Sequence, residues 1–157
     1  MQKIQPFLWF DTQAEEAATY YTSLFNDARI TNISRYGDAG PGKLGSVMMV
    51  NFQLEGQDFM ALNGGPVYKI NQAISFFVNC ESQSEVDHLW DALSDGGEIL
   101  QCGWLVDKFG VTWQIVPTKL GELLGDEDPI KAGRVMEAML KMKKIDTAEL
   151  LRAYNQE

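Results

Sequence analysis

The sequence is short of the side chains on which metal and covalent chemistry usually depend. Its 157 residues include one histidine and two cysteines, and 13 lysines and arginines stand against 22 aspartates and glutamates. This supply of cysteine and histidine is too small for the complete ligand set of a zinc finger, which excludes that class. The formal net charge of -9 argues against nucleic-acid and membrane-surface partners, because phosphates and anionic head groups would be repelled.

Long hydrophobic runs are also missing. No apolar run approaches the roughly 18 residues of a membrane-spanning helix, and the start MQKIQPF lacks the basic and apolar regions of a secretory leader. We therefore expect a cytoplasmic protein, in which Cys80 and Cys102 are reduced thiols rather than a disulfide. A chain of this length buries about 70% of the surface that its unfolded form exposes, so the core requires no cofactor, and none is predicted.

The first half of the chain shows the order strand, helix and three strands. The strands are expected at residues 4–10, 29–36, 46–54 and 58–62, and the helix covers AEEAATYYTSLF. Asp11 or Thr12 is expected to cap this helix, since either side chain can accept a hydrogen bond from its first turn. The turn Glu55-Gly56-Gln57 indicates a hairpin between the last two strands.

The second half repeats this order. Its strands are expected at residues 73–79, 99–101, 104–106 and 112–116, and a capped helix covers Ser82–Ser94. The segment Asp107-Lys108-Phe109-Gly110 between the last two strands is typical of a β-turn. Residues 7–10 align with residues 74–77, a period of about 67 residues that indicates a duplicated half-domain.

These patterns predict an α+β fold of two βαβββ modules that form curved mixed sheets around a cleft. Residues 1–157 are expected to make a single domain with module one at 1–66, module two at 70–117 and a helical tail at 119–157. The tail is rich in leucine and methionine and is expected to pack on the sheet or on a second subunit. The unpaired sheet edges and this tail predict a homodimer.

The candidate ligand-binding residues follow from strand alternation in the second module. Side chains that point away from its helix would line the cleft, and these are Ala73, Ser75, Phe77, Trp104, Thr112 and Gln114. Trp104 is the first choice to wall a pocket for a flat aromatic or quinone-like ligand. Ser75 and Gln114 can orient that ligand, because each can donate and accept hydrogen bonds.

Two other reactive side chains fit less easily into a site. Cys102 lies at the strand edge beside Gly103-Trp104 and is either a thiol that touches the ligand or a small apolar filler. His88 lies within the second helix, between Asp87 and Leu89, where a surface or boundary position is expected.

Several strings, taken with the order of elements, resemble one known family. PFLWFD, FMALNGGP, CGWLVDKFGVTWQIVP and VMEAMLKMKKID are similar to the PhnB-like or 3-demethylubiquinone-9 3-methyltransferase-like branch of the vicinal oxygen chelate superfamily. That superfamily includes glyoxalase I, dihydroxybiphenyl dioxygenase and the bleomycin-resistance proteins. The resemblance covers nearly the whole chain. It implies paired βαβββ modules, commonly in homodimers, with a cleft that holds one divalent ion in the metal-dependent relatives.

The resemblance also implies where such an ion would bind. Relatives use His, Gln or Glu from the first strand of each module and from the last strand, and these positions fall here at Gln5 or Pro6, Ala73 and Gln114. Proline and alanine side chains cannot coordinate a metal, and a neutral amide is a weak ligand, so no metal is expected. The methyltransferase name lacks support as well, since no Gly-rich turn joins a strand to a helix as in a doubly wound cofactor-binding sheet.

Three functions remain. The leading hypothesis is a small-molecule binding protein or enzyme of this superfamily that works without a tightly held metal. The second is a metal-dependent lyase, isomerase or dioxygenase whose ligands have moved to Glu55, Asp58 or Asp107. The third is a non-catalytic, drug-sequestering protein similar to the bleomycin-resistance proteins. The residues do not identify a reaction or a substrate.

Overall fold

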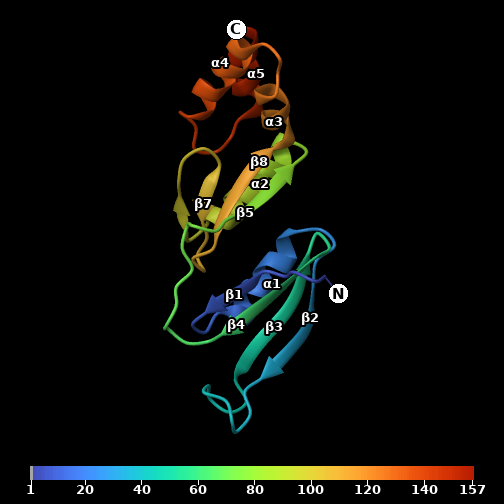
Figure 1. Ribbon diagram of the computed structural model, residues 1–157, viewed down its shortest axis with the longest axis vertical. Coiled ribbons are helices and arrows are strands. Elements are labelled where there is room, and N and C mark those ends of the chain that lie inside the picture. The colour runs from blue at the N-terminus through green and yellow to red at the C-terminus, as the bar shows by residue number, and fades with distance from the viewer. Residues whose placement is uncertain (1) are drawn as a thin grey trace. The chain divides into compact units, whose positions relative to one another are not determined.

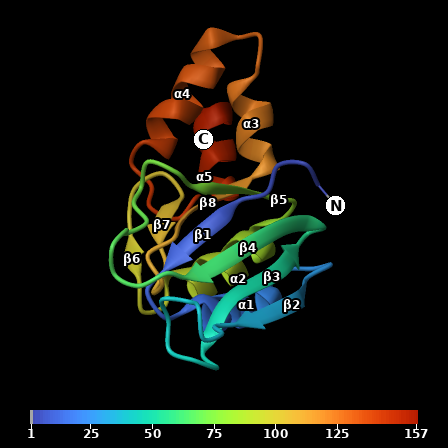
Figure 2. The same cartoon turned by 60° about the horizontal axis from the view of Figure 1, so that its bottom comes forward.

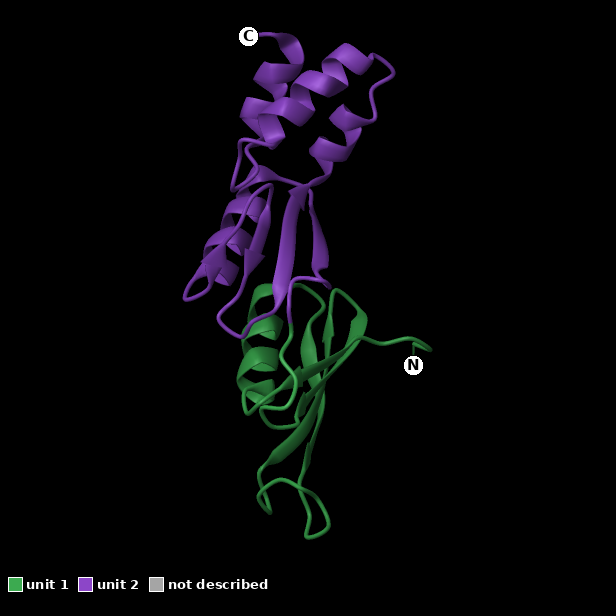
Figure 3. Cartoon of the chain, turned by 60° about the vertical axis from the view of Figure 1, so that its left-hand side comes forward, with its two compact units in different colours: residues 1–70 green, residues 71–157 purple. Residues whose placement is uncertain are grey.

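The chain contains two four-stranded sheets with the same strand order. The computed structural model describes residues 2–157 and divides into two compact units, residues 1–70 and 71–157 (Figure 3). The strand order is β1-β4-β3-β2 in the first sheet and β5-β8-β7-β6 in the second (Figure 1). The predicted α+β fold with twin βαβββ modules is therefore confirmed. The single domain with a cleft between its modules stays a prediction.

The first unit is a sheet with one helix on one face. β1 (Phe7–Phe10) pairs in parallel with β4 (Gln57–Asn63), and β3 (Val47–Leu54) runs antiparallel to β4 and to β2 (Arg29–Arg35). The helix α1 (Ala14–Leu24) buries four residues, Ala14, Ala17, Ala18 and Tyr21. Below it, the Phe52 ring stacks on Phe59 with ring centroids 5.2 Å apart. Bulky rings fill this half of the core.

The second unit repeats the arrangement. β5 (Phe76–Cys80) pairs in parallel with β8 (Thr112–Pro117), and β7 (Trp104–Val106) runs antiparallel between β8 and β6 (Glu98–Ile99). The helix α2 (Gln83–Ser94) buries Val86, Leu89, Trp90 and Leu93. The predicted cap is confirmed, because Ser82 Oγ accepts a hydrogen bond of 3.2 Å from the Glu85 amide.

The expected cap of the first helix is wrong. Neither Asp11 nor Thr12 caps α1, and the residue before the helix, Gln13, makes no capping hydrogen bond through its side chain. Instead, Asn63 Oδ1 accepts a hydrogen bond of 2.8 Å from the Ala14 amide. Asn63 lies at the end of β4 and is remote from α1 in sequence, so only the pairing of β4 with β1 brings it there.

The start of the second module also differs from the prediction. β5 begins at Phe76, and Ala73 lies in a turn that precedes it, where the Ala73 amide donates to Asn71 Oδ1. The expected alignment of the two repeats made Phe10 equivalent to Phe77. Phe10 is 4% exposed on the helix-covered face, whereas Phe77 is 53% exposed on the opposite face. Side-chain direction instead matches Phe77 with Phe7, which is 47% exposed.

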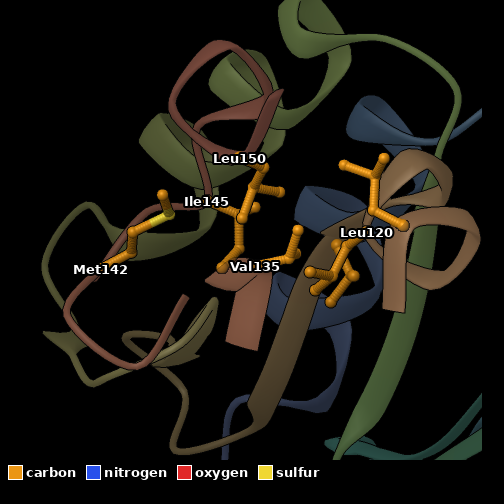
Figure 4. Packing of buried hydrophobic residues seen from close by; sticks show 7 residues of the cluster. Leu120, Val135, Met142, Ile145 and Leu150 are labelled. Atoms are coloured by element: carbon orange, nitrogen blue, oxygen red, sulfur yellow. The ribbon is translucent and has the colours of Figure 1, made fainter. Parts of the chain in front are cut away.

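The tail is helical, as predicted, and belongs to the second unit. It consists of α3 (Thr118–Leu124), α4 (Pro129–Met139) and α5 (Thr147–Asn155), which lie together in Figure 2. Buried residues of these helices and of the connection between α4 and α5 form one cluster with Val116 of β8, made of Leu120, Leu123, Val135, Met142, Ile145 and Leu150 (Figure 4). The tail thus packs on the second sheet where β8 ends. None of the helices in residues 2–157 is long and apolar enough to cross a membrane.

Candidate ligand-binding face

Three of the predicted ligand-binding residues lie in one row across the second sheet. Phe77 on β5 pairs with Gln114 on β8, and Gln114 pairs with Trp104 on β7. Directly paired residues point to the same side of a sheet. The alternate residues Leu105, Trp113 and Ile115 are almost fully buried, on the side covered by α2. The row therefore occupies the face turned away from α2, which we call the open face.

Two polar side chains meet at this row. Gln114 Nε2 donates a hydrogen bond of 2.9 Å to Ser75 Oγ, and both residues are half-buried. Within residues 2–157, neither the amide oxygen of Gln114 nor the hydroxyl proton of Ser75 has a further hydrogen-bond partner. The pair therefore presents one acceptor and one donor to an incoming molecule.

Aromatic surface flanks this polar pair on both sides. Phe77 is 53% exposed, and Trp104 is half-buried. A phenylalanine this exposed, on the edge strand β5, leaves much of its ring available to a partner. The row thus combines two aromatic side chains with a polar pair between them, an arrangement that suits a flat molecule carrying a polar oxygen.

The open face holds one more polar side chain. Thr112 lies two residues before Gln114 on β8 and therefore points to the same side of the sheet. It is 0% exposed, and Thr112 Oγ1 has no hydrogen-bond partner in the described part of the chain. A buried hydroxyl without a partner costs about 1–3 kcal/mol, and because Thr112 is fully covered, a ligand on the open face would not reach this atom.

Cys102 and His88 lie outside this row. Cys102 is in the turn before β7, where its thiol donates to the Met139 carbonyl at 3.6 Å, so its side chain contacts the tail. Ligand contact by Cys102 stays a prediction that no contact in the structure supports. His88 is exposed on α2, as expected from the sequence.

The residues at the metal-ligand positions of the family do not form a metal site. Ala73 lies in a turn and has no donor atom in its side chain, Gln114 offers only a neutral amide oxygen, and the Gln5 side-chain amide donates to the Gln2 carbonyl. Among residues 2–157, no three His, Cys, Asp or Glu side chains come close enough together to hold a metal ion. The donors present therefore do not fit a divalent ion.

The three carboxylates considered as relocated ligands are all engaged within the protein. Glu55 Oε1 accepts from the Asn26 amide at 2.8 Å, in the turn between β3 and β4. Asp58 Oδ1 accepts from Gln53 Nε2 at 2.6 Å, and this hydrogen bond lowers the pKa of Asp58. Asp107 is 3% exposed and accepts from the Phe109 and Val111 amides and from Trp113 Nε1.

Asp107 also stabilises the strand that carries Gln114. The predicted turn at 107–110 is confirmed, since Asp107 Oδ1 accepts a hydrogen bond of 2.8 Å from the Phe109 amide. The sequence did not reveal the third contact, 2.9 Å from Trp113 Nε1 to Asp107 Oδ2. Trp113 directly precedes Gln114, so this buried carboxylate fixes the backbone that carries the central residue of the row.

Comparison with known proteins places the fold in a family. The family described as 3-demethylubiquinone-9 3-methyltransferase matches residues 2–116. A protein from Bacillus cereus described as a 3-demethylubiquinone-9 3-methyltransferase, PhnB protein, is 41% identical, with a TM-score of 0.69 over 74% of this chain and 99% of that chain. No curated protein matches the chain.

Two further structures share the fold at lower identity. A protein from Pseudomonas aeruginosa is 22% identical, with a TM-score of 0.62 over 74% of this chain and 98% of that chain. A variant of a fosfomycin resistance protein from Listeria monocytogenes, complexed with Mn(II) and a dihydroxypropylphosphonic acid, is 13% identical, with a TM-score of 0.51 over 72% of this chain and 90% of that chain. The match over residues 2–116 and the Bacillus cereus structure show that the chain belongs to the 3-demethylubiquinone-9 3-methyltransferase family.

Proposed function

We propose that this protein binds a flat aromatic or quinone-like small molecule on the open face of its second sheet. The observation that carries the proposal is the row Phe77–Gln114–Trp104, with Ser75 hydrogen-bonded to its central member. Rings of the ligand would lie against Phe77 and Trp104, where burial of apolar surface stabilises the complex. The polar pair would then fix the orientation of the ligand.

The free hydrogen-bonding groups define the polar atom of this ligand. A phenol or enol hydroxyl would donate to Gln114 Oε1 and accept from Ser75 Oγ, so that both vacant positions are used. A quinone carbonyl can only accept, and it would use Ser75 alone. We therefore favour ligands that carry a hydroxyl group on an aromatic or conjugated ring.

The first prediction tests this with 2-naphthol as the probe and 2-methylnaphthalene as its counterpart without the hydroxyl. We expect Trp104→Ala and Phe77→Ala each to weaken 2-naphthol binding by about 5- to 30-fold, because each removes a ring that covers the probe. Gln114→Leu should weaken binding of 2-naphthol but leave that of 2-methylnaphthalene nearly unchanged. Titration calorimetry measures all of these affinities.

Ile130→Ala is the control for the probe experiment, because Ile130 is 68% exposed on α4 and lies outside the row. Its affinity for 2-naphthol should equal that of the unmodified protein. Equal affinities in the Phe77, Trp104 and Ile130 variants would contradict the proposed face, as would the absence of any measurable binding of hydroxylated aromatics.

We further propose that the protein holds no tightly bound divalent metal at this face. The support is chemical, since Ala73 offers no donor atom and the neutral amide oxygen of Gln114 is a weak ligand compared with a carboxylate. We expect protein purified without chelator and then dialysed to contain far less than one Mn, Fe, Ni or Zn ion per chain by mass spectrometry. A near-stoichiometric metal would support relocated ligands instead, and alanine variants of Glu55, Asp58 and Asp107 would identify them by loss of that metal.

Binding alone does not distinguish an enzyme from a sequestering protein. Conversion of a bound hydroxyaromatic compound would show an enzyme. Tight binding without turnover, together with drug resistance on expression, would favour the sequestering alternative. The homodimer stays a prediction that light scattering tests, since a mass near 17.6 kDa would indicate a monomer.

A further inference from the structure

We propose that the connection between α4 and α5, residues 140–146, acts as a positioning element for the ligand-binding residues Trp104 and Gln114. This inference rests on the proposed function. The connection holds the turn Cys102-Gly103, and that turn is attached to both ligand-binding residues. Residues 140–146 lie outside the part of the chain that matches the family, residues 2–116. The dependence would therefore involve a segment that the family match over residues 2–116 does not include.

The connection binds the turn through consecutive backbone hydrogen bonds. The Cys102 amide donates to the Met142 carbonyl at 2.9 Å, and the Gly103 amide donates to the Lys143 carbonyl at 2.7 Å. The Cys102 thiol adds a contact of 3.6 Å to the carbonyl of Met139, the last residue of α4. Two consecutive peptide N–H groups of the turn thus donate to two consecutive carbonyls of the connection.

The same turn is linked directly to the candidate face. Trp104 follows Gly103 in the chain, so the orientation of the Gly103 peptide sets where the Trp104 side chain begins. The Gly103 carbonyl also accepts a hydrogen bond of 2.8 Å from the Ile115 amide, and Ile115 follows Gln114. A displacement of Gly103 would therefore shift both an aromatic and a polar member of the row.

The geometry of the turn makes it sensitive to the tail. Cys102 has a φ of 55°, which is unfavourable for a residue with a Cβ atom, and Gly103 has a φ of 82°. A Cβ atom added at Gly103 would lie 2.9 Å from the Ile115 carbonyl oxygen and 3.1 Å from Ile145 Cγ1. The Ile145 side chain therefore packs closely against the turn and supports a conformation that Cys102 would not adopt readily by itself.

The connection is also fixed from the side of α2. Gln83 Nε2 donates to the Ile145 carbonyl at 3.0 Å, and Gln83 Oε1 accepts from the Thr147 amide at 2.8 Å. Lys144 forms an ion pair of 2.8 Å with Asp87. Ile145 itself is 0% exposed in the tail cluster (Figure 4). Because these contacts fix the part of the connection that carries Ile145, a change in the packing of the tail there would act on the turn.

The test compares two variants of the full chain that remove similar buried volume. Ile145→Ala and Leu150→Ala both act on side chains that are 0% exposed in the same cluster, and only Ile145 packs against Gly103. With fluorotryptophan at the four tryptophans, we expect Ile145→Ala to shift or broaden the fluorine resonance of Trp104, assigned with Trp104→Phe. Leu150→Ala should leave it in place. Ile145→Val, which retains Cγ1, should restore the signal.

The second readout is the affinity for 2-naphthol. We expect it to fall by about 3- to 30-fold in Ile145→Ala and to change little in Leu150→Ala. If Ile145→Ala does not fold, Gly103→Ala replaces it. Gly45→Ala is then the control, because Gly45 lies in the first unit, has a φ of 79° and has no atom within 4 Å of its added Cβ. The proposal would be overturned if the Trp104 resonance changed as much in the control variant as in the Ile145→Ala or Gly103→Ala variant.

The two proposals fail in different ways. If the unmodified protein does not bind 2-naphthol while Ile145→Ala still moves the Trp104 resonance, the proposed function fails and the positioning role of the connection stands. If 2-naphthol binds and the Trp104 resonance is the same in all variants, the positioning role fails and the proposed function stands.

Discussion

Replacement of Asp107 by alanine is expected to lower the free energy of unfolding of the second unit by about 3–5 kcal/mol. The carboxylate is 3% exposed and accepts three hydrogen bonds, from the Phe109 and Val111 amides and from the indole of Trp113. Alanine would leave these buried N–H groups without an acceptor. Folding would still remove each group from water, and no hydrogen bond would compensate for that loss. Urea unfolding followed by tryptophan fluorescence and by circular dichroism measures the loss.

Two further variants make the Asp107 experiment specific. Asp107→Asn should lower the free energy of unfolding by a smaller amount, about 1–3 kcal/mol, because the amide keeps one acceptor oxygen. The remaining loss reflects removal of the charge and of part of the hydrogen bonding. Asp95→Ala, at an exposed position after α2, should stay within about 0.5 kcal/mol of the unmodified protein. If Asp107→Ala were as stable as Asp95→Ala, the carboxylate would not be holding the turn and the indole together.

Iodoacetamide is expected to modify Cys102 and leave Cys80 almost untouched in the folded protein. Cys80 is 0% exposed, and burial, with a smaller effect of Glu85, raises the pKa of its thiol to about 12. At pH 8 only about one Cys80 in ten thousand would be the reactive thiolate. Cys102 is half-buried at the surface turn before β7. We expect its initial labelling rate to exceed that of Cys80 by at least about a hundredfold.

Peptide mass spectrometry after short exposure to iodoacetamide measures the two rates separately. In concentrated guanidinium chloride both cysteines should react at similar rates, since unfolding removes the burial that protects Cys80. Cys102→Ser should leave a folded protein with almost no reactive thiol. Rapid modification of Cys80 in the folded state would show that β5 opens readily and would contradict the close packing of this strand under α2.

The candidate face was partly predictable because strand alternation is a local property. The alternation selected Phe77, Trp104 and Gln114 as residues on the same side, and the observed pairing places them in one row. The prediction failed at Ala73, because β5 begins only at Phe76, later than the hydrophobic pattern suggests. Local patterns locate the centre of a strand better than its ends, where turn geometry competes with pairing.

Contacts between distant segments were not predictable in the same way. Asn63 caps α1 from the end of β4, and the connection between α4 and α5 holds the turn before Trp104. In both cases a backbone group is satisfied by a partner many residues away. No periodicity in the sequence marks such a partner, because any polar side chain or carbonyl could serve once the fold brings it near.

The sequence by itself determined the order of the elements, the duplication and the shortage of metal-binding side chains, since composition and the periods of helices and strands are written along the chain. Only the tertiary structure decided the register between the modules, the cap of α1, the three donors around Asp107 and the support of Trp104 by the tail. These features depend on which surfaces are buried together, and burial is a property of the packed chain rather than of any single segment.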